Sequence, residues 1–443
     1  MLATALVALF AMGGVSSDAS AAPAWSKPVT LGQTGRESSQ PQIAVTPGGE
    51  AFVVWEGVRP GGIRVSSRAP GHGWRRPKTF ETTNQSEPQI AATGRKAVVV
   101  WSGAIRGQGS GEASVFAATR LPGGRWSKPE NISAEKRWLY EPEGEDPQVA
   151  ISPQGEAIAM WTASDEGHST TSFIRAATQP PRGGWTSPIG LRGSIEGEEP
   201  QLAVSPKGEA VAIWHAYYNE ESGMEVASRP PRGKWSGVTR LSNPGAFPEP
   251  EIAITRKGEA VAAWEVEGEG AWAEQRLQVA TRKPGLRWRV KTFAPLEEEE
   301  VRTPQIVTEA GGRAAAFWLR STANVKGEVV VAAHPPGGTW THPRSLFGAG
   351  FEGPPEIAAT GRGEWIAVWR SAGSGPRQSI IQAASKRRGQ PWSAPVTLSG
   401  SPAAPISRAS EPSLAVTPKG EVFAVWQAYN GSRWVIESAV RMP

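Results

Sequence analysis

The sequence predicts an all-β fold: a single eight-bladed β-propeller of four-stranded antiparallel blades, closed by pairing of the N-terminal strand with the last blade. Three observations predict it. One pattern of fifteen residues occurs eight times, and each copy carries strand and turn signals without a helical period. The two ends of the chain are also out of phase by one strand. Closure of a ring would bring those ends together.

The repeated pattern is clearest in residues 200–214, PQLAVSPKGEAVAIW, and residues 412–426, PSLAVTPKGEVFAVW. Each copy ends on a tryptophan, and successive tryptophans lie 46 to 60 residues apart, with a mean spacing of 53: Trp55, Trp101, Trp161, Trp214, Trp264, Trp318, Trp369 and Trp426. A period near fifty residues without helical patterning is typical of propeller blades and not of helical solenoids.

Each repeat of about fifty residues, which begins with one copy of this pattern, is predicted to form four strands. The segment PQLAVS predicts a short first strand, PKGE a tight turn with glycine at positive φ, and EAVAIW a β-branched second strand. A loop of variable length follows, then a third strand such as residues 224–229. After a Pro/Gly turn, the fourth strand opens on a tryptophan, as in residues 25–31. Four strands joined by hairpins make one blade.

The fourth strands supply a second series of tryptophans: Trp25, Trp74, Trp126, Trp185, Trp235, Trp288, Trp340 and Trp392. Together the two series hold 16 of the 20 tryptophans. A large side chain at a fixed place in every blade is expected to fill the wedge between neighbouring blades. Sugar stacking by this set is the alternative.

The ends of the chain predict closure. Residues 25–31 form a fourth strand with no blade before it, and residues 434–440 form a third strand with no fourth strand after it. A closed ring joins these strands and removes both sheet edges. We therefore predict one propeller domain over residues 22–443, with seven blades and a detached unit as the alternative.

Composition excludes several classes of function. Lys and Arg total 47 against 42 Asp and Glu, a formal charge of +5 without a dense basic run, so no nucleic-acid partner is predicted. Cysteine is absent, which excludes disulfides, thiolate metal sites and cysteine nucleophiles. The five histidines show no metal-binding spacing, and neither a metal nor another cofactor is predicted.

Residues 1–21 have the apolar length of a signal peptide and end in the small-x-small pattern Ala19-Ser20-Ala21. The alternative, a membrane anchor, needs about 20 apolar residues, and the stretch from Gly13 to Ser20 is too polar to extend the run. We expect a secreted, extracellular monomer that begins near Ala22, with no membrane span after signal removal.

The turn before the fourth strand resembles the Asp-box repeat of bacterial sialidases, Ser-x-Asp-x-Gly-x-Thr-Trp. The segment AHPPGGTW keeps Gly337, Thr339 and Trp340 but has Pro335 at the Asp position, and SRAPGHGW has Ala69 there. The chain resembles the broad group of secreted bacterial propellers that share this turn. The sialidase arginine triad, Tyr/Glu pair, Asp acid and Arg-Ile-Pro motif find no counterpart in this sequence, so the catalytic residues are unknown.

The two faces of the predicted disc differ in loop length. The turns between first and second and between third and fourth strands are short and uniform, whereas the remaining loops vary. Binding sites are often built from variable loops on a rigid scaffold. Aromatic and polar residues in those loops form a candidate carbohydrate site: Trp138, Tyr140, Tyr217, Tyr218, Asn219, Glu220, Trp272, Tyr429 and Asn430. Alternatively, these aromatics anchor their own loops.

Acidic residues form a second candidate set. Five of them directly precede the proline that opens a first strand, at the expected mouth of the channel: Glu87, Asp146, Glu199, Glu249 and Glu411. A ring of carboxylates there could bind a cation or an amino sugar. The alternative is a turn constraint that recurs with the repeat.

These patterns favour a non-enzymatic recognition scaffold for carbohydrate or a cell-envelope partner. A divergent sialidase-like glycoside hydrolase is the alternative from another class, although no paired acids are evident. A protein–protein interaction platform without a small-molecule site is the third hypothesis.

Overall fold

The computed structural model describes residues 24–443 with gaps at 35–38, 58–60, 95, 105–112, 121–123, 135–142, 165–170, 192, 194–195, 219–220, 243–244, 248, 268–274, 294–299, 322–326, 349–350, 374–377 and 400–407. The predicted signal peptide, residues 1–21, lies outside the described residues. The described part of the chain contains no helix long and apolar enough to cross a membrane.

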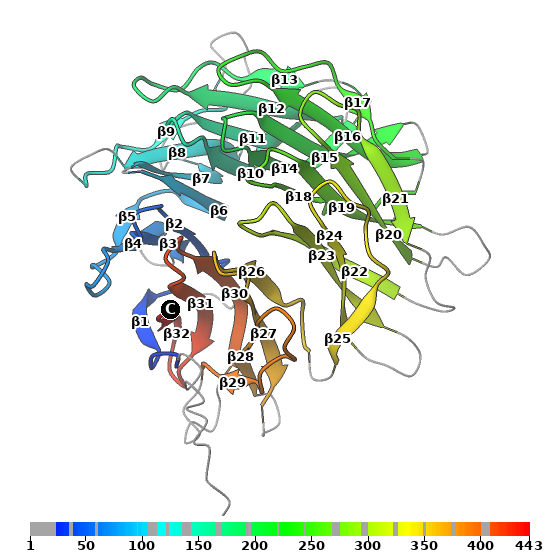
Figure 1. Ribbon diagram of the computed structural model, residues 1–443. Helices are drawn as coiled ribbons and strands as arrows, with labels where there is room; N and C mark the ends of the chain where they lie inside the picture. Colours follow the sequence, from blue (N-terminus) through cyan, green and yellow to red (C-terminus); the bar gives the residue numbers. More distant parts are fainter. Residues whose placement is uncertain are drawn as a thin grey trace, which may run out of the picture.

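The described residues form eight four-stranded antiparallel sheets arranged as a closed propeller, which confirms the predicted fold (Figure 1). From the innermost strand outward, blades 1 to 4 comprise β2 (Gln42–Val45), β3 (Ala51–Gly57), β4 (Gly62–Arg68) and β5 (Lys78–Phe80); β6 (Thr83–Thr93), β7 (Lys96–Ala104), β8 (Ser114–Arg120) and β9 (Glu130–Asn131); β10 (Glu143–Ile151), β11 (Ala157–Ser164), β12 (Ser172–Gln179) and β13 (Ile189–Leu191); and β14 (Glu196–Val204), β15 (Ala210–Tyr218), β16 (Glu221–Arg229) and β17 (Thr239–Arg240).

Blades 5 to 8 follow in the same order: β18 (Glu251–Ile254), β19 (Ala260–Glu267), β20 (Gln275–Arg282) and β21 (Arg289–Phe293); β22 (Glu300–Thr308), β23 (Ala314–Ser321), β24 (Glu328–His334) and β25 (Arg344–Gly348); β26 (Glu356–Ala359), β27 (Trp365–Ala372), β28 (Ser379–Lys386) and β29 (Val396–Thr397); and β30 (Arg408–Val416), β31 (Val422–Tyr429), β32 (Trp434–Arg441) and β1 (Val29–Gln33).

The core lies between blades, on both faces of each second strand. Every second strand ends near its buried tryptophan, and these indoles pack on the preceding blade; Trp161 of blade 3, for example, lies in one cluster with Val98 and Val115 of blade 2. The fourth-strand tryptophans close the outer part of the same wedge, as Trp126 does with its edge-on contact to Phe52 of blade 1 at 6.2 Å. The expected wedge-filling role of the two series is therefore the one seen in these contacts.

Blade 8 is completed by the N-terminal strand, as the phase of the ends predicts. β1 pairs antiparallel with β32, with Val29 opposite Ser438 and Gln33 opposite Val435. The Ser26 amide donates to the Val440 carbonyl at 2.7 Å and extends the seam. In Figure 1 the first strand lies directly beside the last one. The ring is thus closed by hydrogen bonds, and β1 gives blade 8 the four strands that every other blade has.

We call the side of the disc with the first–second and third–fourth turns the short-turn face, and the opposite side the long-loop face. On the short-turn face, the last residue of a turn in one blade bonds the end of the third strand in the next blade. Six boundaries carry this pair: Glu421–Arg68, Glu50–Arg120, Glu156–Arg229, Glu209–Arg282, Glu259–His334 and Glu364–Arg441. The repeated Glu of the PKGE turn therefore joins neighbouring blades.

Candidate functional site

The acidic residues that precede the first strands share an unusual backbone conformation. All five have positive φ, between 49° and 65°: Glu87, Asp146, Glu199, Glu249 and Glu411. Gln40 and Thr303 hold the same place in blades 1 and 6, also at positive φ. Such a conformation is uncommon outside glycine, and here it coincides with a register shift beside a proline that has no amide hydrogen, as at Asp146 in blade 3.

Three of these side chains bind the backbone of the next blade around the channel. The Glu87 carboxylate accepts the amide hydrogen of Asp146 at 2.8 Å, and Glu199 accepts that of Glu249 at 2.7 Å. Glu411 accepts the amide of Gln40 at 2.9 Å across the closure of the ring. These charge-assisted bonds stabilise both the strained backbone and the blade contact.

The structure therefore places the five predicted carboxylates at equivalent positions of their blades, and three of them, Glu87, Glu199 and Glu411, contact the next blade. Among the described residues, no three His, Asp or Glu side chains are grouped so that they could hold a metal ion. Binding of a cation or an amino sugar by this ring stays a prediction.

Three further glutamates near the channel have raised pKa values. Burial, together with the charges of Glu356 and Glu249, raises the pKa of Glu251 to about 8. Burial raises the pKa of Glu356 to about 7 and that of Glu265 to about 7. Like charges in a poorly solvated channel favour the protonated forms. The channel is thus acidic in composition but partly neutral at pH 7.

On the long-loop face of blade 8, three side chains stand in one row. Arg408 of β30 lies opposite Tyr429 of β31, which lies opposite Trp434 of β32. Directly opposed residues of antiparallel strands project from the same side of the sheet. The Tyr429 and Trp434 rings lie 5.3 Å apart, and the Tyr429 hydroxyl donates to the Gly431 carbonyl. The Tyr429 ring therefore packs against the Trp434 indole.

This row borders a pocket of about 440 Å³ between blades 7 and 8. Its lining comes from both blades: Glu352, Gly353, Pro354, Glu356, Arg370, Ser379, Arg408, Ser410, Glu411, Pro412 and Trp434. The indole of Trp434, two arginines and three glutamates thus line the same pocket. The Nε of Arg370 binds Glu352 at 3.0 Å. The volume falls within the range of small-molecule sites.

Asn430 and Tyr218, two further candidates, form hydrogen bonds within their own hairpins. Asn430 accepts hydrogen bonds from the amides of Ser432 and Arg433 and so closes the β31–β32 turn. The Tyr218 hydroxyl donates to Glu225 at 2.7 Å, and burial followed by this bond raises the pKa of Tyr218.

Tyr217 occupies in blade 4 the register position of Tyr429 in blade 8, opposite Glu196 and Ser222 in place of an arginine and a tryptophan. Its ring meets the His215 ring edge-on at 4.6 Å. The two matching loops therefore do not build matching sites. Five other candidates lie outside the described residues: Trp138, Tyr140, Asn219, Glu220 and Trp272.

Sequence reasoning missed Trp434 and the arginines of the pocket. Trp434 is one of the few tryptophans outside the two repeat series, and it follows Tyr429 after a four-residue turn that contains Asn430 and Gly431. A short hairpin of this kind pairs its two flanking residues, and that signal could have identified the row.

Comparison with known proteins identifies a shared fold and no family. No protein-family model matches the chain, and no curated protein matches it. Among solved structures, the polysaccharide lyase Uly1 is similar with a TM-score of 0.52 at 10% identity, over 94% of this chain and 100% of that one. A PL25 ulvan lyase bound to an oligosaccharide gives 0.52 at 9% identity, over 81% and 94%. The NanB sialidase of Streptococcus pneumoniae gives 0.43 at 8%, over 89% and 83%.

Proposed function

We propose that this protein is a secreted, non-enzymatic propeller that recognises carbohydrate through the pocket between blades 7 and 8. The observation that carries the proposal is the row of Arg408, Tyr429 and Trp434 along a pocket of about 440 Å³. An indole face covers the apolar side of a sugar ring, while neighbouring polar groups take its hydroxyls. The row is fixed by cross-strand pairing, so little order is lost on binding.

Carboxylates and guanidinium groups in the pocket suit a hydroxyl-rich ligand. Glu352 and Arg370 already pair with each other at the rim, where both side chains are roughly two-fifths exposed. Glu411 is held by the amides of Ser39 and Gln40. These groups are oriented before a ligand arrives, and carboxylate and guanidinium groups can bind sugar hydroxyls.

A glycoside hydrolase is the second candidate, and Glu356 favours it. This pocket-lining carboxyl group has a pKa raised to about 7 by burial, as a general acid requires. The described lining contains two arginines, Arg370 and Arg408, where a sialidase-like site would bring three together. Of the other two acids in the lining, Glu352 pairs with Arg370, and Glu411 is engaged by backbone amides of blade 1. We therefore place recognition first.

The test is retention of residues 22–443 on an immobilised panel of glycans and cell-wall polysaccharides, with mass spectrometry of the same wells. We expect retention without cleavage, weakened about tenfold or more by Trp434→Ala because the stacking surface is lost. The matched control is Leu286→Ala, which removes a side chain 60% exposed in the β20–β21 turn of the short-turn face.

The other outcomes separate the hypotheses. Cleavage that stops in Glu356→Gln would replace recognition by hydrolysis at the same pocket. Equal binding by the Trp434→Ala and Leu286→Ala variants would move the glycan site elsewhere. Absence of retention across the panel would contradict carbohydrate recognition and favour a protein partner.

A further inference from the structure

The boundary between blades 6 and 7 breaks the ion-pair pattern of the short-turn face. In blade 6 the turn reads EAGGRA (residues 309–314) where blade 4 reads SPKGEA (residues 205–210), so Arg313 takes the place of the repeated glutamate. Its counterpart at the end of the third strand of blade 7 is Lys386, which lies opposite Trp365. Two cations thus occupy positions that a glutamate and an arginine fill at five other boundaries, and a glutamate and His334 at a sixth.

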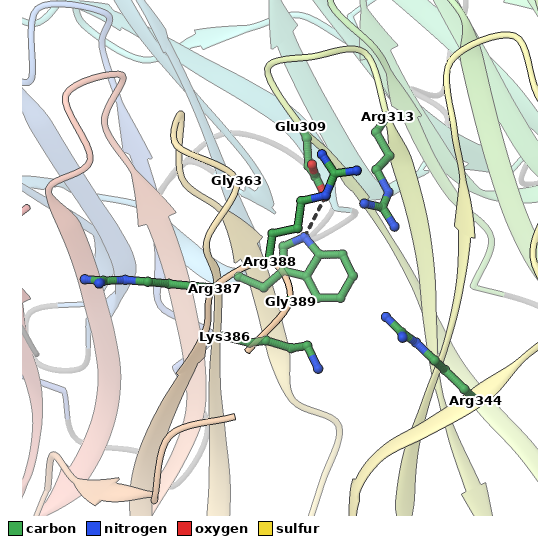
Figure 2. A pocket seen from close by; sticks show the side chains of 9 residues that line it. Glu309, Arg313, Arg344, Gly363, Lys386, Arg387, Arg388 and Gly389 are labelled. Atoms are coloured by element: carbon green, nitrogen blue, oxygen red, sulfur yellow. Dashed lines mark hydrogen bonds between the residues drawn. The ribbon is translucent and has the colours of Figure 1, made fainter. Parts of the chain in front are cut away.

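A pocket of about 290 Å³ opens at this boundary. We call it the cation pocket, and its lining residues are Glu309, Arg313, Arg344, Gly363, Trp365, Lys386, Arg387, Arg388 and Gly389. Figure 2 shows Arg313, Arg344 and Lys386 directed from three sides into the same space beside the indole, with Arg387 directed away. The guanidinium carbon of Arg313 lies 6.0 Å from the centre of the Trp365 ring.

Apart from Arg387, whose Nε lies 3.9 Å from Glu364, the cations of the cation pocket have no ion-pair partner within the described part of the chain. Arg313, Arg344 and Lys386 form no ion pair with any described residue, and the Nε of Arg313 is buried without a hydrogen-bond partner. Burial, followed by the charge of Arg344, lowers the pKa of Lys386. A buried polar atom without a partner is costly, so the pocket has a free-energy deficit that an anion would relieve.

The two carboxylates at this boundary already have partners. Glu309, which lines the pocket, accepts the indole hydrogen of Trp365 at 3.0 Å, and Glu364 binds Arg441 of blade 8 and lies 3.9 Å from the Nε of Arg387. The boundary between blades 2 and 3 also lacks the glutamate, but there Lys96 donates to the Gly155 carbonyl at 2.9 Å and the opposing residue is the neutral Gln179. Among the described boundaries, two cations face each other at this place only between blades 6 and 7.

The neighbouring boundary extends the cationic surface. A second pocket of about 220 Å³, between blades 5 and 6, carries four more basic residues: Lys283, Arg287, Arg289 and Lys291. Its acid, Glu259, is already bound to His334 at 3.2 Å. Positive charge therefore continues across two adjacent boundaries on one face, which favours a ligand with more than one negative group.

We propose that the cation pocket binds a carboxylate group of an acidic ligand, which takes the place of the glutamate missing from this repeat. The model for the contact is the pair that the chain itself forms at other boundaries, where Glu156 accepts two hydrogen bonds from Arg229 at 3.0 and 2.9 Å. A planar carboxylate can accept two hydrogen bonds from the Arg313 guanidinium, while Arg344 and Lys386, which point into the same space in Figure 2, add positive charge around it. This site lies on the face opposite to the proposed sugar pocket and is independent of it.

The test is calorimetric titration of residues 22–443 at low ionic strength with three probes: galacturonate, trigalacturonate and inorganic phosphate. Saturable binding of galacturonate is expected, and tighter binding of trigalacturonate would identify a carboxylate carried on a chain. Arg313→Glu restores the repeat pattern, so it is expected to fold, to raise the Tm in the absence of ligand, and to weaken binding about tenfold or more. Lys386→Met should weaken binding similarly without restoring the pair.

The matched control is Lys207→Ala, which removes an exposed cation from the corresponding turn of blade 4. It is expected to leave binding unchanged. Equal losses in Lys207→Ala and Arg313→Glu would reduce the effect to general charge attraction and overturn the site. Failure of both uronates to bind, or tighter binding of phosphate, would overturn the assignment to a carboxylate.

Discussion

Single residues near the channel determine how the molecule responds to pH. Glu251 opens the first strand of blade 5 and has a pKa raised to about 8 by burial and by the charges of Glu356 and Glu249. The folded chain therefore holds a proton that the unfolded chain releases above its ordinary pKa near 4.5. The resulting stability is fully present below about pH 4.5 and is lost as the pH rises through 8.

We predict that Glu251→Gln flattens this dependence. The neutral amide keeps the shape of the side chain and removes the charge, so the variant should gain stability at pH 8 and change little at pH 5. Thermal unfolding across pH 5 to 9 measures the difference. The control is Glu81→Gln, an exposed glutamate after β5. Parallel profiles for the wild type and Glu251→Gln would contradict the assignment.

At the scale of strands and turns, blades are joined by side chains of the short-turn face. The Glu156–Arg229 pair has two hydrogen bonds, and both side chains are less than a tenth exposed. Loss of one partner leaves a buried charge without compensation, which costs about 3 to 5 kcal/mol. The contact therefore specifies how blade 3 meets blade 4.

We predict that Glu156→Gln lowers the free energy of unfolding by about 3 kcal/mol or more, and that adding Arg229→Met recovers part of the loss. Urea denaturation of the four members of the cycle measures the coupling. The control is Glu221→Gln in the exposed Arg240–Glu221 contact at 3.4 Å, where we expect no more than about 1 kcal/mol. Equal effects at both places would mean that the buried pair is not a specific blade contact.

The strands were predictable because their repeat is local, but their side-chain partners were not. The PKGE turn and the strands around it follow from neighbouring residues, and the structure places them as predicted. The bond from Glu50 to Arg120 crosses a blade boundary and 70 residues of chain, and no local pattern reports such a distance. The two pockets could not be predicted for the same reason. Trp434 and Arg370 line one of them, Arg313 and Lys386 line the other, and each pair comes from two blades.

For the acidic residues before the first strands, the sequence predicts the position but not the conformation or the contacts. Their position at the channel was predictable from the order of strands. Their positive φ and their bonds to the next blade depend on the register shift at the Glu-Pro step, as at Glu199, which is a property of paired strands and not of one segment.

For the whole molecule, the small net charge of +5 conceals an uneven distribution. Exposed cations recur in the described turns of the short-turn face: Arg75, Arg76, Lys207, Arg232, Lys234, Arg256, Lys257, Lys283, Arg287, Arg362, Arg387, Arg388 and Lys419. The glutamates of that face are largely paired across blades, whereas the channel holds carboxylates. The short-turn face and the channel therefore differ in charge and can meet different partners.

Ring closure predicts that one strand supports the entire disc. Deletion of residues 22–34 removes β1, exposes the outer edge of β32 and takes Leu31 out of its cluster with Trp55 and Ile436. We expect the Tm to fall by roughly 5 °C or more in circular dichroism, with the whole β signal lost in one transition. An unchanged Tm would contradict closure by β1. Substitution of Ser26 by Ala, which keeps the strand, is the milder control.

Closure also sets an order of events during synthesis. Ser26 and Val440 meet across 414 residues of sequence, so the first strand made waits for the last one. At a synthesis rate of about 5 to 20 residues per second, that interval is roughly 20 to 80 seconds. During this interval β1 has no partner strand, and the completed blades form an open arc whose two ends are exposed. The nascent chain therefore exposes unpaired strand edges until β32 has been made.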